Sequence, residues 1–319
     1  MVNPVRVAVI GVGYLGKIHA KIYHGMENVE LVAAVDIDAA AAAEAASRYG
    51  CEGLTTADDL LDRVDAVSIA VPTSAHLDVS RPFLEAGIHT LLEKPIAPSV
   101  EESARVVGLA SRSRAILQIG HLERFNAGVM KLAELAENPR FIECHRLGEF
   151  VERATDVDVV TDLMIHDIDI VLTLVNSKLR NVSAAGTRVI TDFVDIANAR
   201  LEFENGAVAN VTASRVSREQ FRRIRVFSEN RYLGLNFANQ QLEEIRAREG
   251  ASGNSYPELA HSRIDVVPQL PLDAELAHFI ECIQEGKPPL VRGEDGLVAV
   301  EVAELVRQKI HESMVAGDQ

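Results

Sequence analysis

The feature that most constrains this chain is a glycine-rich turn directly after its first apolar run. The run Val5–Ile10 is typical of a buried strand, and it leads through Gly11-Val12-Gly13-Tyr14-Leu15-Gly16 into a helical segment. A second apolar run, 31–35, ends at Asp36, which lies 20 positions after Gly16. A strand, this glycine spacing, a helix and an acidic residue at that distance characterise a dinucleotide-binding βαβ unit. We therefore predict a Rossmann fold at the N-terminus, with the whole turn, including Tyr14 and Leu15, at the dinucleotide.

Each part of the turn has a role in holding such a ligand. Gly11 permits the tight turn, Gly13 lets the backbone approach the pyrophosphate, and Gly16 allows close packing of helix on strand. The helix offers free N–H groups and its positive dipole end to the phosphates. Asp36 can accept hydrogen bonds from the adenosine ribose and would repel a 2′-phosphate, and no arginine follows it directly. We therefore expect NAD rather than NADP. FAD, and glycines that only shape a turn, are the alternatives.

The pattern of apolar residues changes near residue 120. Before that point, apolar runs without alternation are separated by helical segments, which indicates a parallel sheet covered on both faces. Beyond it, apolar and polar residues alternate, and Glu204-Asn205-Gly206 is typical of a hairpin turn between two strands. A second hairpin is predicted at 223–237, helices at 274–283 and 295–313, and a loop at 246–271.

These patterns predict an α/β fold with two domains. We expect a doubly wound parallel sheet in an N-terminal Rossmann NAD-binding domain, 1–120. We expect a C-terminal α/β domain with a large, open, mainly antiparallel sheet for substrate binding and oligomerisation, 121–319. The C-terminal helices can pack back on the first domain.

Charge and cysteine content exclude several classes of function. The 47 acidic residues outnumber the 32 lysines and arginines, and the net charge of −15 disfavours a nucleic-acid partner because little positive charge can meet phosphates. No apolar stretch reaches the roughly 18 residues that span a bilayer. The N-terminus lacks a signal-peptide pattern, so we expect a cytoplasmic protein without a membrane partner. The three cysteines lie far apart without metal-ligand spacing, so no metal is expected.

The sequence Glu93-Lys94-Pro95 directly follows a strand predicted for 88–92. Ligands of doubly wound sheets bind at the carboxyl ends of the strands, so Lys94 can face the cleft and stabilise a developing alkoxide. A solvated turn lysine is the alternative from the residues alone. Pro95 can hold a cis peptide bond that fixes the turn. We assign Glu93 and Lys94 to the cofactor site together with three residues after the preceding strand: Pro72, Thr73 and His76.

A helix predicted for 162–175 carries Asp162, His166 and Asp169 at i, i+4 and i+7, so that they share one stripe. A carboxylate one turn before a histidine can orient the ring and support its protonated form. This arrangement suits His166 as a general base that accepts an alcohol proton, assisted by Asp162. A histidine satisfied within the core is the alternative. Asp167 lies outside the stripe and is expected to cap or pair structurally.

The glycine turn, Glu93-Lys94-Pro95 and Asp162-x-x-x-His166 occur together in this order. In this combination the chain resembles the glucose-fructose oxidoreductase/inositol dehydrogenase/MocA-like family over essentially its whole length. The resemblance implies an NAD(P)-dependent oxidoreductase acting on CH–OH groups, with an open sheet often used for oligomerisation. It also implies that Lys94, Asp162 and His166 serve catalysis, with the histidine as acid/base. We expect a homodimer or a homotetramer.

A narrower resemblance concerns the substrate. The segments Gln118-Ile119-Gly120-His121-Leu122-Glu123-Arg124-Phe125-Asn126 and Phe141-Ile142-Glu143-Cys144-His145-Arg146 look like those of bacterial UDP-N-acetylglucosamine 3-dehydrogenases. This implies oxidation of the sugar C3 hydroxyl to a ketone, which a pyridoxal-phosphate aminotransferase then transaminates, as in lipid A or surface-sugar biosynthesis. Arginine suits a diphosphate. We therefore assign contacts with a sugar or UDP-sugar to six residues: Lys94, His121, Arg124, Asn126, Arg146 and His166.

Other interpretations stay open at this point. The same chemistry could act on myo-inositol or another free sugar or polyol, and a requirement for UDP in a substrate screen would separate the two. A non-catalytic NAD-binding regulator on the same fold could dispense with the lysine and the histidine, whereas this chain has both. Ordinary surface or interdomain ion pairs are the alternative for the arginines assigned to the substrate.

Overall fold

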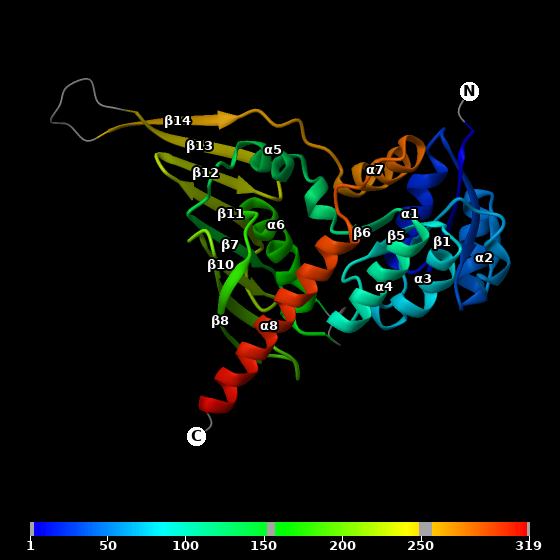
Figure 1. Cartoon of the computed structure of the whole chain (residues 1–319), viewed down its shortest axis with the longest axis horizontal. Coiled ribbons are helices and arrows are strands. Elements are labelled where there is room, and N and C mark those ends of the chain that lie inside the picture. The colour runs from blue at the N-terminus through cyan, green and yellow to red at the C-terminus, as the bar shows by residue number, and fades with distance from the viewer. Residues whose placement is uncertain (1–2, 152–156, 249–256, 318–319) are drawn as a thin grey trace. The chain divides into compact units, whose positions relative to one another are not determined.

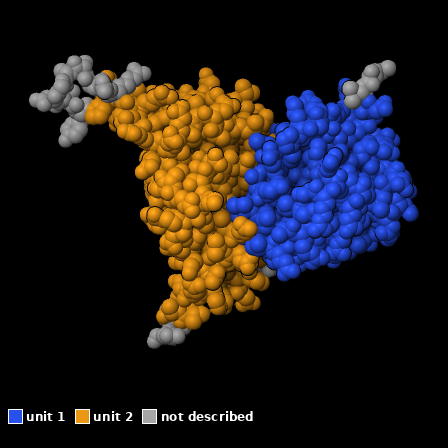
Figure 2. All heavy atoms as spheres, in the orientation of Figure 1, with its two compact units in different colours: residues 1–122, 272–300 blue, residues 123–271, 301–319 orange. Residues whose placement is uncertain are grey.

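Residues 3–151, 157–248 and 257–317 are described by the computed structural model of the chain. They belong to two units: unit 1 is 1–122 with 272–300, and unit 2 is 123–271 with 301–319 (Figure 2). The predicted division after residue 120 lies two residues before the boundary of unit 1, which also includes a later segment of the chain. No helix in the described ranges combines the length and apolar character needed to cross a membrane.

Unit 1 is built on a six-stranded sheet in which every neighbouring pair of strands is parallel. The strand order, β3-β2-β1-β4-β5-β6, reverses between β1 and β4, which is the switch point where doubly wound sheets bind their ligands. The glycine turn follows β1 at this point, so the predicted Rossmann fold is confirmed. The strands are β1 (Val5–Ile10), β2 (Val29–Val35), β3 (Glu52–Leu54), β4 (Ala66–Ile69), β5 (His89–Glu93) and β6 (Leu117–Gly120).

Local sequence signals set the ends of the helices in unit 1. Asp38 caps α2 (Ala39–Tyr49) with its side chain. At the start of α4 (Val100–Ser113), the Ser99 hydroxyl accepts a hydrogen bond from the Glu102 N–H at 3.2 Å, as the capping-box pattern predicts. Unit 1 also contains α1 (Tyr14–His24), α3 (His76–Glu85) and two 3₁₀ turns, η1 (Asp58–Leu60) and η2 (Thr73–Ala75).

A helix from the C-terminal part of the chain completes the core of unit 1. α7 (Pro271–Glu285) buries Leu276, Phe279 and Ile280 in the same apolar cluster as Tyr23 of α1 and the valines of β1. Full burial of a side chain of this size contributes about 1.5–3 kcal/mol. Hydrophobic packing therefore holds α7 on unit 1, although about 150 residues separate it from β6.

Unit 2 is built on an eight-stranded sheet in the order β14-β13-β12-β11-β7-β10-β9-β8. β7 and β10 are parallel, and the other neighbouring pairs are antiparallel. The predicted mainly antiparallel sheet is confirmed. Its strands are β7 (Phe141–Leu147), β8 (Leu179–Thr187), β9 (Ile196–Phe203), β10 (Val208–Ser214), β11 (Phe221–Ser228), β12 (Arg231–Asn236), β13 (Gln241–Arg248) and β14 (Glu258–Ile264).

Helices pack on one face of this sheet (Figure 1). α5 (Ala127–Leu135) contacts β12 and β13, and α6 (Ile165–Val175) contacts β7 and β10. Burial alternates along β9, which puts Leu201 on the buried face and Arg200 on the exposed face. α8 (Gly293–Gly317) begins in unit 1 and continues in unit 2.

The loop predicted over 246–271 is wrong for 246–248 and 258–264, which form strands, whereas 265–270 have no regular secondary structure, as predicted; residues 249–256 lie outside the described residues. β13 extends to Arg248, and β14 pairs with it as an antiparallel edge strand. Many side chains here are exposed, so the sequence lacks the alternation that marks a half-buried strand. Glu244 forms ion pairs with Arg231 and Arg246, both at 2.6 Å. A strand is predicted from alternating apolar residues, and these positions have charged ones instead.

Candidate active site

The glycine turn has the geometry that a dinucleotide requires. Gly11 lies at φ 84°, and a Cβ there would be 2.7 Å from the Ala70 oxygen. A Cβ at Gly16 would lie 1.8 Å from the Gly11 oxygen, so both positions exclude larger residues. A Cβ at Gly13, by contrast, would have no atom within 4 Å, and no side chain caps the N-terminus of α1 there. Open space beside uncapped N–H groups fits a pyrophosphate.

The Asp36 carboxylate is fixed beside this turn by two backbone donors. Its Oδ2 accepts a hydrogen bond from the Val12 N–H at 2.8 Å, and its Oδ1 accepts one from the Asp38 N–H at 3.0 Å. The side chain is partly exposed, and each carboxylate oxygen can accept more than one bond. Asp36 can therefore still receive the hydroxyls of a ribose. The residues present fit a nicotinamide dinucleotide.

We expect Gly13→Ala to separate folding from dinucleotide binding. The added methyl group has room in the folded chain, so the urea midpoint should not change. The same methyl occupies the space through which a pyrophosphate approaches, so the dissociation constant of NADH should rise at least about tenfold, or about 1.4 kcal/mol. Fluorescence titration with NADH measures this. NADH affinity equal to that of the wild type would contradict the assignment of the turn.

His76 connects two loops at the carboxyl ends of β4 and β5. Its Nδ1 lies 2.9 Å from the Pro95 oxygen and its Nε2 lies 3.0 Å from the Val71 oxygen, and the residue is 1% exposed. Burial lowers the pKa of His76, and a neutral ring can donate only one of these bonds. His76 therefore holds the Pro95 turn, and the direct cofactor contact predicted for it stays a prediction. The cofactor contacts assigned to Pro72 and Thr73, at the start of η2, stay predictions.

The Glu93-Lys94-Pro95 turn follows β5, as predicted, and the Lys94–Pro95 peptide bond is cis. Lys94 is partly exposed at the end of the strand. Glu93 points the other way: it is 6% exposed, its Oε2 accepts a bond from the Lys94 N–H at 3.2 Å, and its Oε1 lies 3.3 Å from Nε2 of His19. The Glu93 carboxylate thus has partners in the interior, and the cofactor contact predicted for it stays a prediction.

In unit 2, His166 lies at the second position of α6, directly after an irregular turn. Residues Val160–Met164 form a π-helical turn, η4, rather than the α-helix predicted from residue 162. Asp158 begins this turn by accepting hydrogen bonds from the N–H groups of Val160 at 3.0 Å and Thr161 at 2.9 Å. π turns are frequent at functional sites. His166 is partly exposed, whereas its neighbours in the first turn of α6 are buried.

The predicted stripe of Asp162, His166 and Asp169 needs correction. The turn that contains Asp162 is wider than an α-helical turn, so the i, i+4 argument does not apply between it and His166. Asp169 is 2% exposed and pairs with Arg124 at 3.2 Å, so it is a structural residue. The catalytic roles of Asp162 and His166 stay predictions.

Arg146 of β7 is buried in an ion cluster. Its guanidinium donates to both carboxylate oxygens of Asp167 at 2.9 Å and to Oε1 of Glu123 at 2.8 Å. It also lies over the ring of Phe237 at 5.1 Å, and it is only 3% exposed. These donors have partners within the core, and the substrate contact predicted for Arg146 stays a prediction. The structural pairing expected of Asp167 is confirmed.

Two further residues assigned to the substrate have structural partners within unit 2. Arg124, in the 3₁₀ turn η3 (Leu122–Phe125), contacts Asp169 and the Thr173 hydroxyl. Asn126 is 3% exposed and caps α5, with its Oδ1 accepting from the Gly128 N–H at 3.0 Å. Asn126 is therefore a helix cap, and its predicted substrate contact stays a prediction. A substrate contact by His121, which is 1% exposed, stays a prediction.

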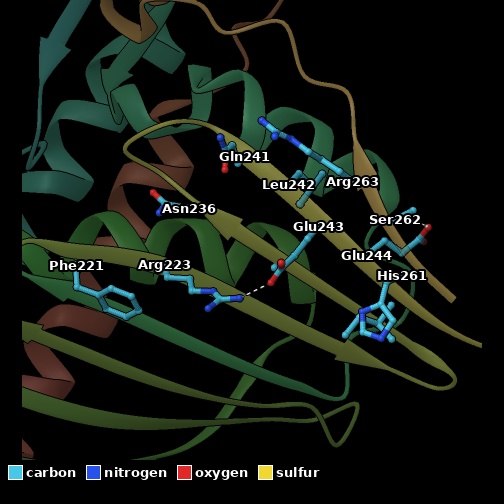
Figure 3. Close-up of a pocket in the computed structure, with 12 residues that line it drawn as sticks. Phe221, Arg223, Asn236, Gln241, Leu242, Glu243, Glu244, His261, Ser262 and Arg263 are labelled. Carbon is cyan, nitrogen blue, oxygen red and sulfur yellow. Dashed lines mark hydrogen bonds and ion pairs between the residues drawn. The ribbon is translucent and has the colours of Figure 1, made fainter. Parts of the chain in front are cut away.

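A hollow of about 470 Å³ lies on unit 2 along β11 to β14 (Figure 3). Arg223, Glu243 and Arg263 line it together with His261, and Arg223 of β11 pairs with Glu243 of β13 across the intervening strand β12. None of the residues predicted for catalysis or cofactor binding belongs to its lining. This hollow is therefore a feature of the sheet surface rather than a candidate active site.

Comparison with known proteins establishes what this fold and these motifs belong to. Residues 5–121 match the oxidoreductase family with an NAD-binding Rossmann fold, GFO/IDH/MocA, and residues 131–233 match the GFO/IDH/MocA C-terminal domain. The chain belongs to the GFO/IDH/MocA oxidoreductase family. The predicted family and enzyme class are confirmed, and a nicotinamide cofactor follows from the Rossmann domain.

Individual members of the family resemble this chain over nearly its full length. It is 37% identical over 303 residues to the UDP-N-acetylglucosamine 3-dehydrogenase of Acidithiobacillus ferrooxidans, covering 95% of this chain and 96% of that protein. A solved structure of that enzyme superposes with a TM-score of 0.90 at 36% identity, over 96% of this chain and 97% of the other. The scyllo-inositol 2-dehydrogenase of Bacillus subtilis is 28% identical over 95% of this chain and 93% of its own.

Proposed function

We propose that this family member oxidises the C3 hydroxyl of UDP-N-acetylglucosamine to a ketone with NAD. The observation that carries the proposal is the 37% identity with a UDP-N-acetylglucosamine 3-dehydrogenase over 95% of the chain. The glycine turn, the strand-end Lys94 and the partly exposed His166 at the start of α6 support the same chemistry.

The reaction divides between two side chains and the cofactor. His166 accepts the proton of the sugar hydroxyl as a general base. The Lys94 ammonium stabilises the negative charge that develops on the same oxygen. An assisting role of the Asp162 carboxylate in this proton transfer is part of the proposal. Bound NAD supplies the acceptor for the hydride that leaves the sugar carbon, while the protein supplies binding and orientation.

We propose NAD rather than NADP because of Asp36. Its carboxylate is held beside the glycine turn by the Val12 N–H, so a 2′-phosphate would meet a fixed negative charge. The hydroxyls of an unphosphorylated ribose would instead donate hydrogen bonds to it. The ratio of kcat/KM for the two cofactors measures this preference.

Further proposals concern the setting of the reaction. A cytoplasmic location and a homodimer or homotetramer fit an enzyme whose second domain has an exposed sheet face. A 3-keto sugar is a substrate for a pyridoxal-phosphate aminotransferase, which would install a 3-amino group in the synthesis of lipid A or of a surface sugar. No nucleic-acid partner is proposed, given the net charge of −15.

A substrate screen tests the proposed function directly. NADH formation is followed with UDP-N-acetylglucosamine, other UDP-sugars, free N-acetylglucosamine, myo-inositol and scyllo-inositol. We expect turnover with UDP-N-acetylglucosamine and at least about 100-fold lower kcat/KM without the UDP group, which corresponds to about 2.7 kcal/mol of binding energy. Preferred oxidation of a free inositol would replace the proposal with the alternative that the 28% identical scyllo-inositol 2-dehydrogenase suggests. NADH binding without turnover of any substrate would favour a non-catalytic regulator.

A further inference from the structure

Six polar side chains from five elements meet inside unit 1, and we refer to them as the interior polar cluster. Five of them are 0% exposed, and Glu93 is 6% exposed. A buried polar group is costly unless it is hydrogen-bonded, so a group of this size requires a physical explanation. The members are His19 and Tyr23 of α1, Ser68 of β4, Glu93 of β5, Gln118 of β6 and Glu275 of α7.

One half of the cluster holds the Glu93 carboxylate under Lys94. Nδ1 of His19 lies 2.7 Å from the Ser68 hydroxyl, and Nε2 of the same ring lies 3.3 Å from Oε1 of Glu93, within ion-pair distance. The Lys94 N–H donates to the other Glu93 oxygen at 3.2 Å. A Cβ at Gly120 would lie 2.8 Å from that carboxylate, so the absence of a side chain at this position makes room for it.

The other half of the cluster has an acid without a visible counter-charge. Both carboxyl oxygens of Glu275 lack a hydrogen-bond partner among the described residues, as does Oε1 of Gln118. Gln118 donates instead to the backbone oxygen of Glu275 at 3.1 Å, which fixes this point of α7 against β6. The Glu93 and Glu275 carboxyl groups interact electrostatically, and the charges of both act on the Tyr23 hydroxyl.

We propose that Glu275 is a positioning residue: as a neutral acid it shares its proton with the Glu93 carboxylate, directly or through a water molecule, and thereby holds the Lys94 turn. Two carboxylates in one buried site cannot both ionise at low cost, so one of them keeps its proton. Glu93 accepts a hydrogen bond from the Lys94 N–H and has the His19 ring 3.3 Å away, whereas neither carboxyl oxygen of Glu275 has a hydrogen-bond partner among the described residues. The proton therefore stays on Glu275.

The remaining groups around Glu275 agree with this assignment. Burial and the charge of Glu93 raise the pKa of Glu275 well above its usual range. Burial also raises the pKa of Tyr23, so the phenol stays neutral. Ser68 and Gln118 carry no charge, and His76, whose pKa is influenced by Glu93, is kept neutral by its own burial. Glu93 is thus the charged neighbour that acts on the acid.

The pH dependence of stability tests the proton on Glu275. An unfolded Glu275 ionises near the ordinary pKa of 4.5, whereas the folded chain keeps it neutral. Folding must then retain a proton, so this residue makes the wild type less stable as pH rises above about 4.5, by up to tenfold per pH unit in the unfolding constant. Urea unfolding between pH 5 and pH 8 should show this slope in the wild type and lose it in Glu275→Gln. Glu281→Gln, an exposed carboxylate on the same helix, should follow the wild type.

Amide exchange at Lys94 tests the positioning role without any assay of activity. Glu275→Gln keeps a donor and should leave the exchange rate of the Lys94 N–H within about threefold of the wild type at pH 7, because a preserved hydrogen bond keeps its free energy. Glu275→Met removes the donor, and the rate should rise at least about tenfold, since the Glu93 carboxylate loses a partner. If Glu275→Met does not fold, the comparison of the wild type with Glu275→Gln between pH 5 and pH 8 still tests the proton.

Two results would overturn the inference. Equal pH slopes in the wild type and Glu275→Gln would show that Glu275 is ionised in the folded chain. Unchanged Lys94 exchange in a folded Glu275→Met would show that the acid does not support the turn. The catalytic consequence, a lower kcat in Glu275→Met with an unchanged KM for NAD, rests on the proposed function. Failure of that function would appear instead as a wild type without turnover, while the two physical measurements keep their meaning.

Discussion

Replacing His166 with alanine should lower kcat about 10²–10⁴-fold, which is the range that a positioned general base contributes. The residue lies at the start of α6, after the π turn, and it is partly exposed between buried neighbours. Loss of the ring removes the acceptor of the hydroxyl proton while leaving the glycine turn untouched. The dissociation constant of NADH should therefore stay within about twofold, a change of less than about 0.5 kcal/mol.

The comparison with an exposed histidine makes this result specific. His311 lies on α8 in the same unit and is exposed, so His311→Ala should keep full activity. Initial rates of NADH formation with UDP-N-acetylglucosamine, together with NADH titration, are measured for both variants. A His166→Ala enzyme with kcat equal to that of the wild type would remove the histidine from the reaction. Reduced NADH affinity in the same variant would instead indicate a role at the cofactor.

The cofactor turn could be predicted because every part of its function is local in sequence. Gly11 and Gly16 touch within one turn of chain, and Asp36 reaches Val12 from the next strand of the same βαβ unit. The physical constraints, a positive φ and a close approach of backbone to backbone, leave glycine as the residue that fits. The motif therefore predicts both the fold of unit 1, which the structure confirms, and a position for its dinucleotide.

The surroundings of the residues assigned to the substrate were harder to predict, because the partners of those residues come from distant parts of the sequence. Arg146 is an arginine near a motif, and nothing in its neighbourhood shows that Asp167 and Glu123, 21 and 23 positions away, enclose it. Asn126 carried a readable signal, since asparagine before Ala127 and Gly128 is a favoured helix cap. For Glu275 the sequence holds no such signal, because Glu93, whose charge acts on it, lies far away in the sequence, at the end of β5.

Arg146→Met should destabilise the protein by about 3–5 kcal/mol, because it leaves buried carboxylates without their counter-charge. The side chains of Asp167 and Glu123 are 1% and 11% exposed, so water cannot replace the guanidinium. Methionine fills much of the same volume, so most of the loss is electrostatic rather than a cavity effect. Without the guanidinium, protonation of these carboxylates removes the uncompensated buried charge, and protonation occurs more readily at low pH. The loss in the free energy of unfolding should therefore be smaller at pH 5 than at pH 8.

Arg225→Met is the matched control for this prediction. Arg225 pairs with Glu143 of β7 from the neighbouring strand, but their side chains are 37% and 24% exposed. Water screens such a pair, so its loss should cost no more than about 1 kcal/mol. Urea unfolding of both variants measures the difference, and adding Asp167→Asn to Arg146→Met should recover part of the stability by removing one stranded charge. If Arg146→Met instead kept full stability and raised the KM for UDP-N-acetylglucosamine at least about tenfold, or about 1.4 kcal/mol, the guanidinium would be a substrate contact after all.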